Sequence, residues 1–211
     1  MGPAPLSASR LLMLLAAVVL VETVTTFLGA RLSLTRLELI AITRLVQLSA
    51  VICLAAWQPR GLHDLGMARD YLKNGIVTGL SWSAAFAIIV MGGAFALFLG
   101  GRDPLALIRM PLPGTTDQRV LFFLIGGIVG PAAEEVVFRG IVFGYLRRWG
   151  AFTAVVGSTL LFAALHPGNG FPFIQTVGGI VFGLAYHRSG SLAAPMIVHM
   201  LGNLALFTLS L

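Results

Sequence analysis

Charged residues are scarce in this sequence, and it has no long hydrophilic block. Lysine, arginine, aspartate and glutamate make up 10% of the 211 residues, whereas a soluble domain carries roughly 25%. Hydrophobic residues make up 57% of the chain, and the mean hydropathy is +0.93. So little charge cannot cover a fold that faces water on all sides. The composition therefore excludes a separate soluble domain and predicts one integral membrane domain.

Paired cysteines and clustered basic residues are missing too. Cys53 is the only cysteine, so no disulfide forms within the chain. Lysine and arginine number 14 against 8 acidic residues, but the longest basic run is Arg147-Arg148. Nucleic-acid binding needs a basic patch or stripe, so we expect no nucleic-acid partner. Single arginines between apolar runs are typical of residues that face lipid headgroups and set topology.

What the chain does contain is a series of apolar segments of about the length that crosses a bilayer, ~20 residues as a helix. They predict an all-α, polytopic transmembrane bundle of about seven helices, with six to eight compatible with the pattern. The first segment is interpreted as a retained helix and not a signal peptide, because Glu22 interrupts its apolar run. The fifth and sixth segments are short, which predicts inner helices shielded by the others or tilted partners at a thinned site. The segments are Leu11–Gly29, Leu37–Trp57, Gly75–Gly100, Val120–Tyr145, Ala151–His166, Phe173–His187 and Leu192–Leu209.

Polar connections suggest how the membrane domain is organised. Residues 1–119 are expected to hold the first helices and an interfacial segment, and residues 120–211 a catalytic helical core. Gln58–Asn74 mixes charges with apolar residues and predicts an amphipathic stretch at the interface. Gly101–Arg119 contains three prolines and cannot be one helix. Pro167–Gly170 is expected to end the fifth segment sharply.

The distribution of basic residues predicts the orientation. If the N-terminus is inside, seven lysines and arginines lie on the inner side and five on the outer side, which favours that orientation. We expect a multi-pass protein of a bacterial plasma membrane, with its oligomeric state open.

Two charged residues in the first two segments are expected to pair. Glu22 and Arg44 each lie seven residues from the short loop that joins their helices. At a rise of 1.5 Å per residue, both lie ~10 Å below the same membrane surface. An unpaired charge at such depth is costly, so we predict a structural ion pair.

A second group of polar residues is concentrated in the C-terminal half. Glu134 and Glu135 are adjacent near the middle of the fourth segment, and Arg139 can pair with Glu135 across one helical turn. Glu134 points about 100° away from Glu135 and has no such partner in its own helix. His166 closes the fifth segment, and His199 lies in the seventh with Asn203 one turn later. Hydrogen bonds among these groups in one hydrated cavity would have the lowest free-energy cost. Scattered interhelical hydrogen bonds remain an alternative.

Such a site could hydrolyse an amide. A glutamate can accept the proton of a water molecule that a histidine orients, and a second histidine with an amide can stabilise the oxyanion. No Gly-x-Ser-x-Gly nucleophile motif occurs. Glu134, His166 and His199 are also the residue types of a hydrolytic zinc site, but the His-Glu-x-x-His helix is absent. We therefore expect no cofactor, with zinc as the alternative.

Three short motifs resemble those of the CAAX protease and bacteriocin-processing family, which includes the type II CAAX prenyl endopeptidases. The resemblance extends from about residue 120 to the C-terminus. The first motif, Glu-Glu-x-x-x-Arg, is matched by Glu134 to Arg139, with Phe138 before the arginine. Phe162 to His166 matches Phe-x-x-x-His, and His199 to Asn203 matches His-x-x-x-Asn.

The resemblance implies an intramembrane endopeptidase of the glutamate type. In that reading Glu134 is the base, His166 orients the water, and His199 and Asn203 stabilise the oxyanion. Glu135 supports the site or shares the role of base. Arg139, Phe138 and Phe162 are supporting residues. The expected substrate is a polypeptide with a membrane-associated tail, cut in a C-terminal or precursor segment. A non-enzymatic immunity or scaffold protein and a proton-coupled transporter remain alternatives.

Overall fold

The computed structural model describes residues 2–166 and 171–211. Helices connected by short loops make up this part of the chain, and it contains no strand. The principal helices are α1 (Ala8–Arg31), α2 (Arg36–Ala56), α3 (Gly61–Asp64), α4 (Arg69–Leu99), α8 (Ala151–Ala164), α9 (Phe173–Ser189) and α10 (Ala193–Thr208). A long composite helix, residues 116–149, lies between α4 and α8. The predicted all-α membrane bundle is confirmed. Residues 167–170, where we expected a sharp end to the fifth segment, lie outside the described residues.

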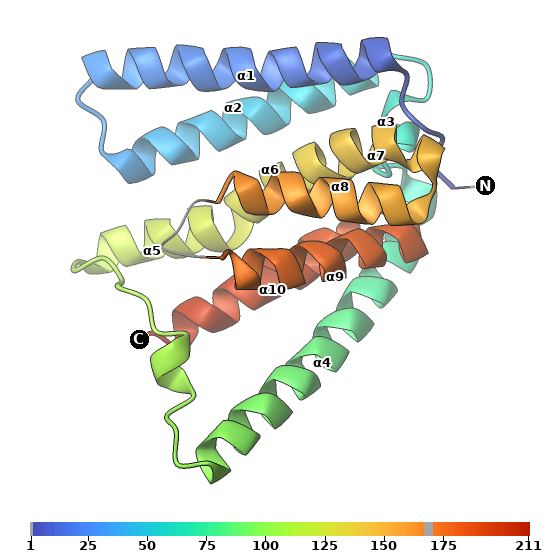
Figure 1. Ribbon diagram of the computed structural model, residues 1–211. Helices are drawn as coiled ribbons and strands as arrows, with labels where there is room; N and C mark the ends of the chain where they lie inside the picture. The colour runs from blue at the N-terminus through green and yellow to red at the C-terminus, as the bar shows by residue number, and fades with distance from the viewer. Residues whose placement is uncertain (1, 167–170) are drawn as a thin grey trace.

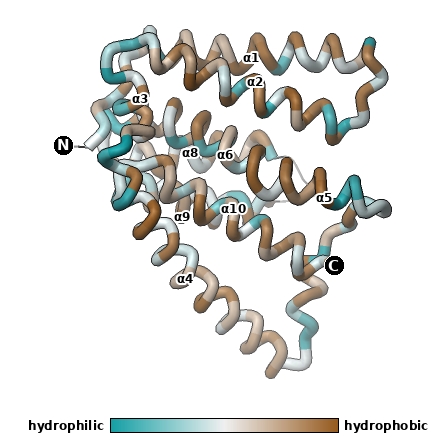
Figure 2. The backbone as a smooth tube through the Cα atoms, turned by 180° about the vertical axis from the view of Figure 1, so that it is seen from behind, coloured by the Kyte–Doolittle hydropathy of each residue, from teal (hydrophilic) through white to brown (hydrophobic). Residues whose placement is uncertain are grey.

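The helices run back and forth between two ends of the molecule (Figure 1). We call them the N-terminal end, which also holds the α2–α4 and α9–α10 connections, and the C-terminal end, which holds the α1–α2 and α4–α5 connections. Figure 2 shows brown, apolar tube along the helices and teal mainly toward the two ends. Four helical stretches are long and apolar enough to cross a membrane, and α8 and α10 are shorter apolar helices.

The helical starts are encoded locally. Ser7 caps α1 by accepting a hydrogen bond from the Arg10 backbone N–H. Thr35 and Glu38 form a capping box at the start of α2, which satisfies two backbone donors reciprocally. The capping box lets α2 begin within a few residues of the end of α1, so the two helices form an antiparallel pair, and α2 packs on α6 (Figure 1).

The predicted ion pair joins α1 to α2. Arg44 Nη1 lies 3.0 Å from Glu22 Oε2. Gln47 completes the group, because it accepts from Arg44 Nη1 at 2.6 Å and donates to Glu22 Oε2 at 2.9 Å. The predicted pair is therefore observed, with Gln47 as a third polar member that the sequence reading did not include. Gln47 lies three residues after Arg44, on the same helix face.

The composite helix changes its winding around the two adjacent glutamates. Its parts are α5 (Thr116–Leu124), the π-helical segment η2 (Ile125–Val129), α6 (Gly130–Glu135), the π-helical segment η3 (Val136–Phe143), α7 (Gly144–Leu146) and the 3₁₀ turn η4 (Arg147–Trp149). Pro131 begins α6 and has no N–H for a hydrogen bond to the preceding turn. Wide turns of this kind are common at functional sites.

The segment before α4 packs its apolar side chains against the core of the bundle. Leu65 is wholly buried, in a core cluster with Leu192 and Tyr186, and Leu62 and Met67 pack against that cluster. The stretch is therefore amphipathic, as predicted, because its apolar side chains pack on the core while Arg60 and Arg69 are exposed. Its position at the membrane interface stays a prediction. In addition, α4 begins at Arg69, six residues before the predicted start.

Helix α4 packs against α10 through its first half and then diverges (Figure 1). At Gly79 an added Cβ would lie 2.9 Å from Ile197 Cβ and 3.0 Å from the Ala194 carbonyl oxygen. Further along the helix, Ile88, Ile89 and Met91 have about 70% of their surface exposed. The second half of α4 is therefore a lipid-facing helix that leaves the bundle open on one side.

Helices α8 and α9 are close neighbours but are not shielded. A Cβ added at Gly179 would lie 2.8 Å from Thr159 Cγ2, so the glycine permits close approach within one chain. Both helices keep apolar residues on the outside, such as Phe152, Leu160 and Phe173. The prediction of inner helices was therefore wrong, because each short helix has one face in the core and one facing lipid.

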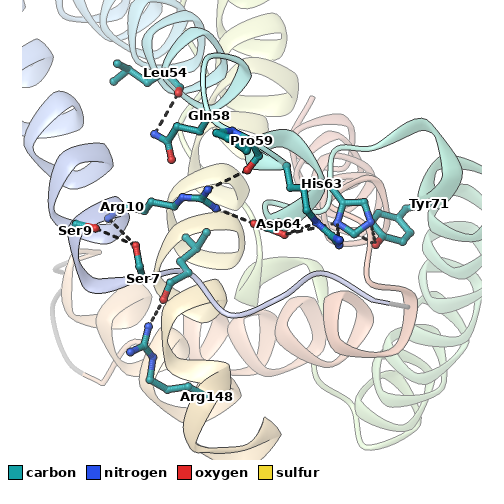
Figure 3. Close-up of polar contacts among 12 residues, drawn as sticks. Ser7, Ser9, Arg10, Leu54, Gln58, Pro59, His63, Asp64, Tyr71 and Arg148 are labelled. Carbon is teal, nitrogen blue, oxygen red and sulfur yellow. Dashed lines mark hydrogen bonds and ion pairs between the residues drawn. The ribbon is translucent and has the colours of Figure 1, made fainter.

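The N-terminal segment is tied to the bundle by arginines (Figure 3). Arg10 Nη1 donates to Asp64 Oδ2 at 2.8 Å, and Arg148 donates to the Leu6 carbonyl. The Leu6 N–H donates to the Gly144 carbonyl at 3.0 Å, and the Leu6 side chain is buried. Residues 2–7 thereby connect α1 and α3 to the end of the composite helix.

Candidate active site

One cavity of about 480 Å³ contains all four residues that the sequence singled out as catalytic. Glu134 comes from α6, His166 from the residues after α8, and His199 and Asn203 from α10. Most of the other lining residues are apolar and come from α4, η1 (Leu105–Leu107) and the residues after it, and α8–α10. The predicted convergence of these polar groups is therefore observed. Scattered interhelical hydrogen bonds, the alternative, do not describe this arrangement.

Glu134 lies between the two histidines. Its Oε1 is 3.7 Å from His166 Nε2, and its Oε2 is 3.8 Å from His199 Nε2. The Glu134 side chain is 22% exposed and that of His166 32%. Hydrogen bonds between such atoms are usually 2.7–3.2 Å long. The carboxylate therefore faces both rings at a separation slightly longer than a direct hydrogen bond.

His166 has a defined tautomer. Its Nδ1 lies 2.7 Å from the Phe162 carbonyl oxygen, and a carbonyl can only accept a hydrogen bond. Nδ1 therefore carries the hydrogen, and in the neutral ring Nε2 presents a lone pair toward Glu134. The ring also lies 4.4 Å from the Phe162 ring, centroid to centroid. The Phe-x-x-x-His spacing thus positions the histidine through both the carbonyl and the ring of Phe162.

His199 is oriented by the second glutamate. Its Nδ1 lies 2.9 Å from Glu135 Oε1, and its ring stacks on Phe182 at 4.4 Å with an interplanar angle of 19°. With an ionised Glu135 the Nδ1 atom donates, so the neutral ring again presents the Nε2 lone pair to the cavity. Both histidines therefore direct the same kind of atom toward Glu134.

Glu135 and Arg139 form a pair that is 0% exposed. Arg139 donates from Nη1 to Glu135 Oε1 at 3.1 Å and from Nη2 to the Gly179 carbonyl at 3.0 Å. Its guanidinium carbon lies 5.0 Å from the Phe162 ring centroid, and Phe138 packs edge-on against Phe162. Glu135 does not line the cavity. Of its two anticipated roles, this position fits support of His199.

Asn203 lines the cavity with one of its amide hydrogens already engaged. Its Nδ2 donates to the Gly126 carbonyl in η2 at 2.8 Å. That bond fixes the side chain and leaves the second N–H for a ligand. The carbonyl partner comes from 77 residues earlier in the chain, and no sequence spacing signals it.

Sequence reasoning missed Phe182 and the apolar wall of the cavity. Phe182 stacks on His199 and lies 5.3 Å from the Arg139 guanidinium carbon. It is one of 14 phenylalanines, and nothing in its local pattern sets it apart. The wall formed by Phe86, Leu107, Ile108 and Met110 comes from residues 1–119, where no motif was recognised.

The donor chemistry also bears on zinc. A histidine that ligates a metal usually donates its other ring N–H to a carboxylate or carbonyl, and His166 and His199 both make such a bond. In the part of the chain that the structure describes, however, no group of three or more His, Cys, Asp and Glu residues is placed to hold a metal ion. The tautomers of His166 and His199 are those of metal ligands, but the distances between the candidate ligand residues do not fit a metal ion.

Comparison with known proteins points to one family. Residues 116–205 match the model of the family described as type II CAAX prenyl endopeptidase Rce1-like. The chain is 41% identical over 92 residues to the membrane-embedded CAAX protease MroQ of Staphylococcus aureus, an alignment that covers 39% of this chain and 36% of the relative. It is 31% identical over 84 residues to the putative membrane peptidase YdiL of Bacillus subtilis, covering 39% and 34%. The chain thus spans about a third of the length of these relatives, and no solved structure matches.

The matched region contains Glu134, Glu135, Arg139 and both histidines of the cavity. The relatives are bacterial membrane proteins by name and organism, and the apolar helices span a membrane by length and composition. The chain is therefore an integral membrane protein, expected in the plasma membrane, and its residues 116–205 are similar to the Rce1-like CAAX protease family.

Proposed function

We propose that this protein is an intramembrane endopeptidase in which Glu134 activates a water molecule. The observation that carries the proposal is the position of the Glu134 carboxylate between two histidine Nε2 atoms, in a cavity among apolar helices. The match of residues 116–205 to the family described as type II CAAX prenyl endopeptidase Rce1-like supports it.

The tautomers suggest how the water is held. A water between Glu134 and His166 donates one hydrogen to the carboxylate and the other to the Nε2 lone pair, which leaves its oxygen free to attack a carbonyl carbon. Glu134 accepts the proton as the new carbon–oxygen bond forms. The same proton then passes to the amide nitrogen as the carbon–nitrogen bond breaks, so the carboxylate is regenerated.

The oxyanion of the tetrahedral intermediate needs donors on the opposite side of the cavity. Asn203 provides the second hydrogen of Nδ2. His199 provides an Nε2 hydrogen when its ring is protonated, because Nδ1–H is already directed at Glu135. A buried carboxylate stabilises such an imidazolium, as the aspartate does in the Ser-His-Asp triad. Glu135 therefore acts through His199 and is a positioning residue.

The cavity walls suggest an apolar substrate segment. Phe86, Leu107, Ile108, Met110 and Leu206 line it, and the second half of α4 leaves the bundle nearby (Figure 1). We propose as substrate a polypeptide whose C-terminal or precursor segment is membrane-associated, because such a segment can approach from the lipid.

A zinc-dependent peptidase is the second candidate. It is favoured by the hydrogen bonds that tie up Nδ1 in both histidines. Glu134, His166 and His199 would have to approach one another to hold the ion, because their present spacing does not fit one; zinc would then supply a bound water of lowered pKa. The same residues would then be essential, so only metal dependence distinguishes the two candidates.

Cleavage by the purified full chain in lipid nanodiscs tests the proposal. A panel of membrane-anchored peptides is incubated with the wild type, Glu134→Gln and the matched control Asp117→Asn, and products are identified by mass spectrometry. Asp117 is an exposed carboxylate in the first turn of α5. We expect cleavage by the wild type and the control and none by Glu134→Gln. Unchanged cleavage by Glu134→Gln would exclude the proposed base.

A chelator arm addresses the alternatives. Loss of cleavage with chelator and recovery with added zinc would establish the metal route, whereas unchanged cleavage supports direct activation by Glu134. Absence of cleavage from the whole panel, together with tight binding of a panel peptide, would favour a non-enzymatic scaffold or immunity role.

A further inference from the structure

A second cavity, of about 590 Å³, lies at the N-terminal end of the bundle. Its walls come from the N-terminal segment, the start of α4, the junction of η4 and α8, and the end of α9. None of its lining residues lines the cavity that contains Glu134. Its charged side chains are those of Asp70, Arg147 and Arg188, and its other polar lining residues are Tyr71, Asn74, His187 and Ser189.

This cavity lies at the level expected for lipid headgroups. It is formed where four helical elements begin or end. Trp149 lies between the lining residues Arg147 and Ala151 in the chain and is 57% exposed. Trp57, at the same end of the bundle, is 88% exposed. Exposed tryptophans mark the membrane–water interface. A ligand in this cavity would therefore contact both water and the part of the lipid acyl chains that lies next to the headgroups.

The charge of the cavity suits a single negative charge. Two arginines against one aspartate leave the lining with a net charge of +1 when His187 is neutral, and a phosphodiester carries −1. Arg147 is fixed in place, because Nη1 donates to the Pro3 carbonyl at 2.7 Å and the guanidinium carbon lies 4.9 Å from the Tyr186 ring centroid. Arg188 is exposed at the end of α9.

The walls are held together by hydrogen bonds between distant parts of the chain. Asn74 Nδ2 donates to the Ser189 carbonyl at 3.0 Å and so joins α4 to α9. The N-terminal wall is held by the bonds of Arg10 and Arg148 in Figure 3. A cavity with fixed walls loses little conformational entropy when it binds a ligand.

We propose that this cavity binds the phosphate group of a glycerophospholipid, between Arg147 and Arg188. The side-chain amide oxygen of Asn74 can accept a hydrogen bond from a headgroup hydroxyl, because Asn74 lines the same space. Basic pockets between transmembrane helices bind lipid headgroups for the same electrostatic reason. The bound lipid would fasten the N-terminal segment, α4 and α9 to one another.

Thermal unfolding of the purified full chain in neutral detergent tests the site. Dihexanoyl phosphatidylglycerol is titrated at constant ionic strength into the wild type, Arg188→Gln and the control Arg102→Gln, which removes an exposed arginine at the opposite end. We expect a saturable rise in Tm for the wild type and control, and a half-saturation concentration about fivefold higher for Arg188→Gln. Asp70→Asn removes the negative charge that opposes phosphate binding and should lower the half-saturation concentration.

Other outcomes would overturn the proposal. Inorganic phosphate that reproduces the full rise at equal concentration would make this a site for soluble phosphate. If dihexanoylglycerol, which has no phosphate, produces the same rise in Tm, the phosphate group does not contribute to binding. Equal titrations for the wild type and Arg188→Gln, or weaker binding by Asp70→Asn, would contradict the placement of the phosphate. Native mass spectrometry of retained lipid provides the same comparison without thermal unfolding.

Discussion

His199 and Glu135 are 64 residues apart in the chain, yet Nδ1 of the histidine lies 2.9 Å from Oε1 of the glutamate. The same carboxylate oxygen accepts from Arg139 at 3.1 Å. One buried atom therefore connects an ion pair within a single helix to a cavity residue on another. Because Glu135 serves both groups, its roles in stability and in activity can be separated by mutation.

Glu135→Gln should impair both stability and cleavage. Without the carboxylate, Arg139 is a buried charge with no counter-ion, and breaking such a pair costs about 3–5 kcal/mol. Cleavage should fall by about 10- to 100-fold, because the oriented His199 loses its anionic partner. The double variant Glu135→Gln/Arg139→Gln should recover much of the Tm but none of the kcat. Recovery of kcat in the double variant would contradict the proposed positioning of His199.

Asn203→Ala should act mainly on the chemical step. Removal of one oxyanion donor typically lowers kcat by about 10²–10³-fold. KM should change little if the second amide hydrogen is used only in the transition state. Steady-state kinetics on a cleaved panel peptide would measure both constants. Ser210→Ala, on the same chain end but outside the cavity, is the control, and an increase in KM alone for Asn203→Ala would assign Asn203 to substrate binding.

Two glycines of α4 should respond differently to the same change. Gly79→Ala places a methyl group against Ile197 and the Ala194 carbonyl, and overpacking of this kind costs about 1–3 kcal/mol. Gly92→Ala meets no atom within 4 Å and should be neutral or stabilising, since alanine is the better helix former. Thermal unfolding in detergent would compare them. Equal Tm values would mean that α4 does not pack on α10 as described.

The Glu22–Arg44 pair should show charge complementarity. Arg44→Glu places two acidic side chains together, and an uncompensated charge in the membrane costs roughly 2–3 kcal/mol. The exchange Glu22→Arg/Arg44→Glu should restore part of the lost Tm. Failure of the exchange to restore any stability would indicate that Gln47, and not the ion pair, holds the two helices together.

The distribution of basic residues predicts a cytoplasmic N-terminal end. In a Cys53→Ser background, Arg102→Cys should react with a membrane-impermeant thiol reagent added to intact cells. Arg69→Cys, exposed at the N-terminal end, should react only after the cells are opened. The reverse pattern would place the C-terminal end in the cytoplasm. The His166 side of the candidate active-site cavity lies toward that end.

The sequence was sufficient for features that depend on composition or on spacing within one helix. Apolar runs predicted every principal membrane helix, and loop lengths predicted the depth of Glu22 and Arg44. The four cavity residues were identifiable because polar groups are rare in apolar helices, where each one needs a partner. Their roles in catalysis remain predictions.

Features that depend on the meeting of distant segments could not be predicted. The partner of Asn203 is a backbone carbonyl in η2, and every residue has a carbonyl. The inward face of Leu65 and the outward faces of α8 and α9 depend on which neighbours lie beside them, which periodicity in one segment does not specify. The π-helical turns around Glu134 and Glu135 could not be predicted either, because the same apolar residues occur in α-helical and in π-helical turns.

The short sequence separation of Glu135 and Arg139 bears on how the protein is made. A glutamate and an arginine one turn apart can neutralise each other as soon as their own helix forms, before the later helices have left the ribosome. His199 is synthesised 64 residues later, so the carboxylate enters the bilayer already paired and accepts its second partner only when the last helix is inserted. An incompletely translated chain would therefore be tolerated by the membrane and would lack the proposed hydrolase activity.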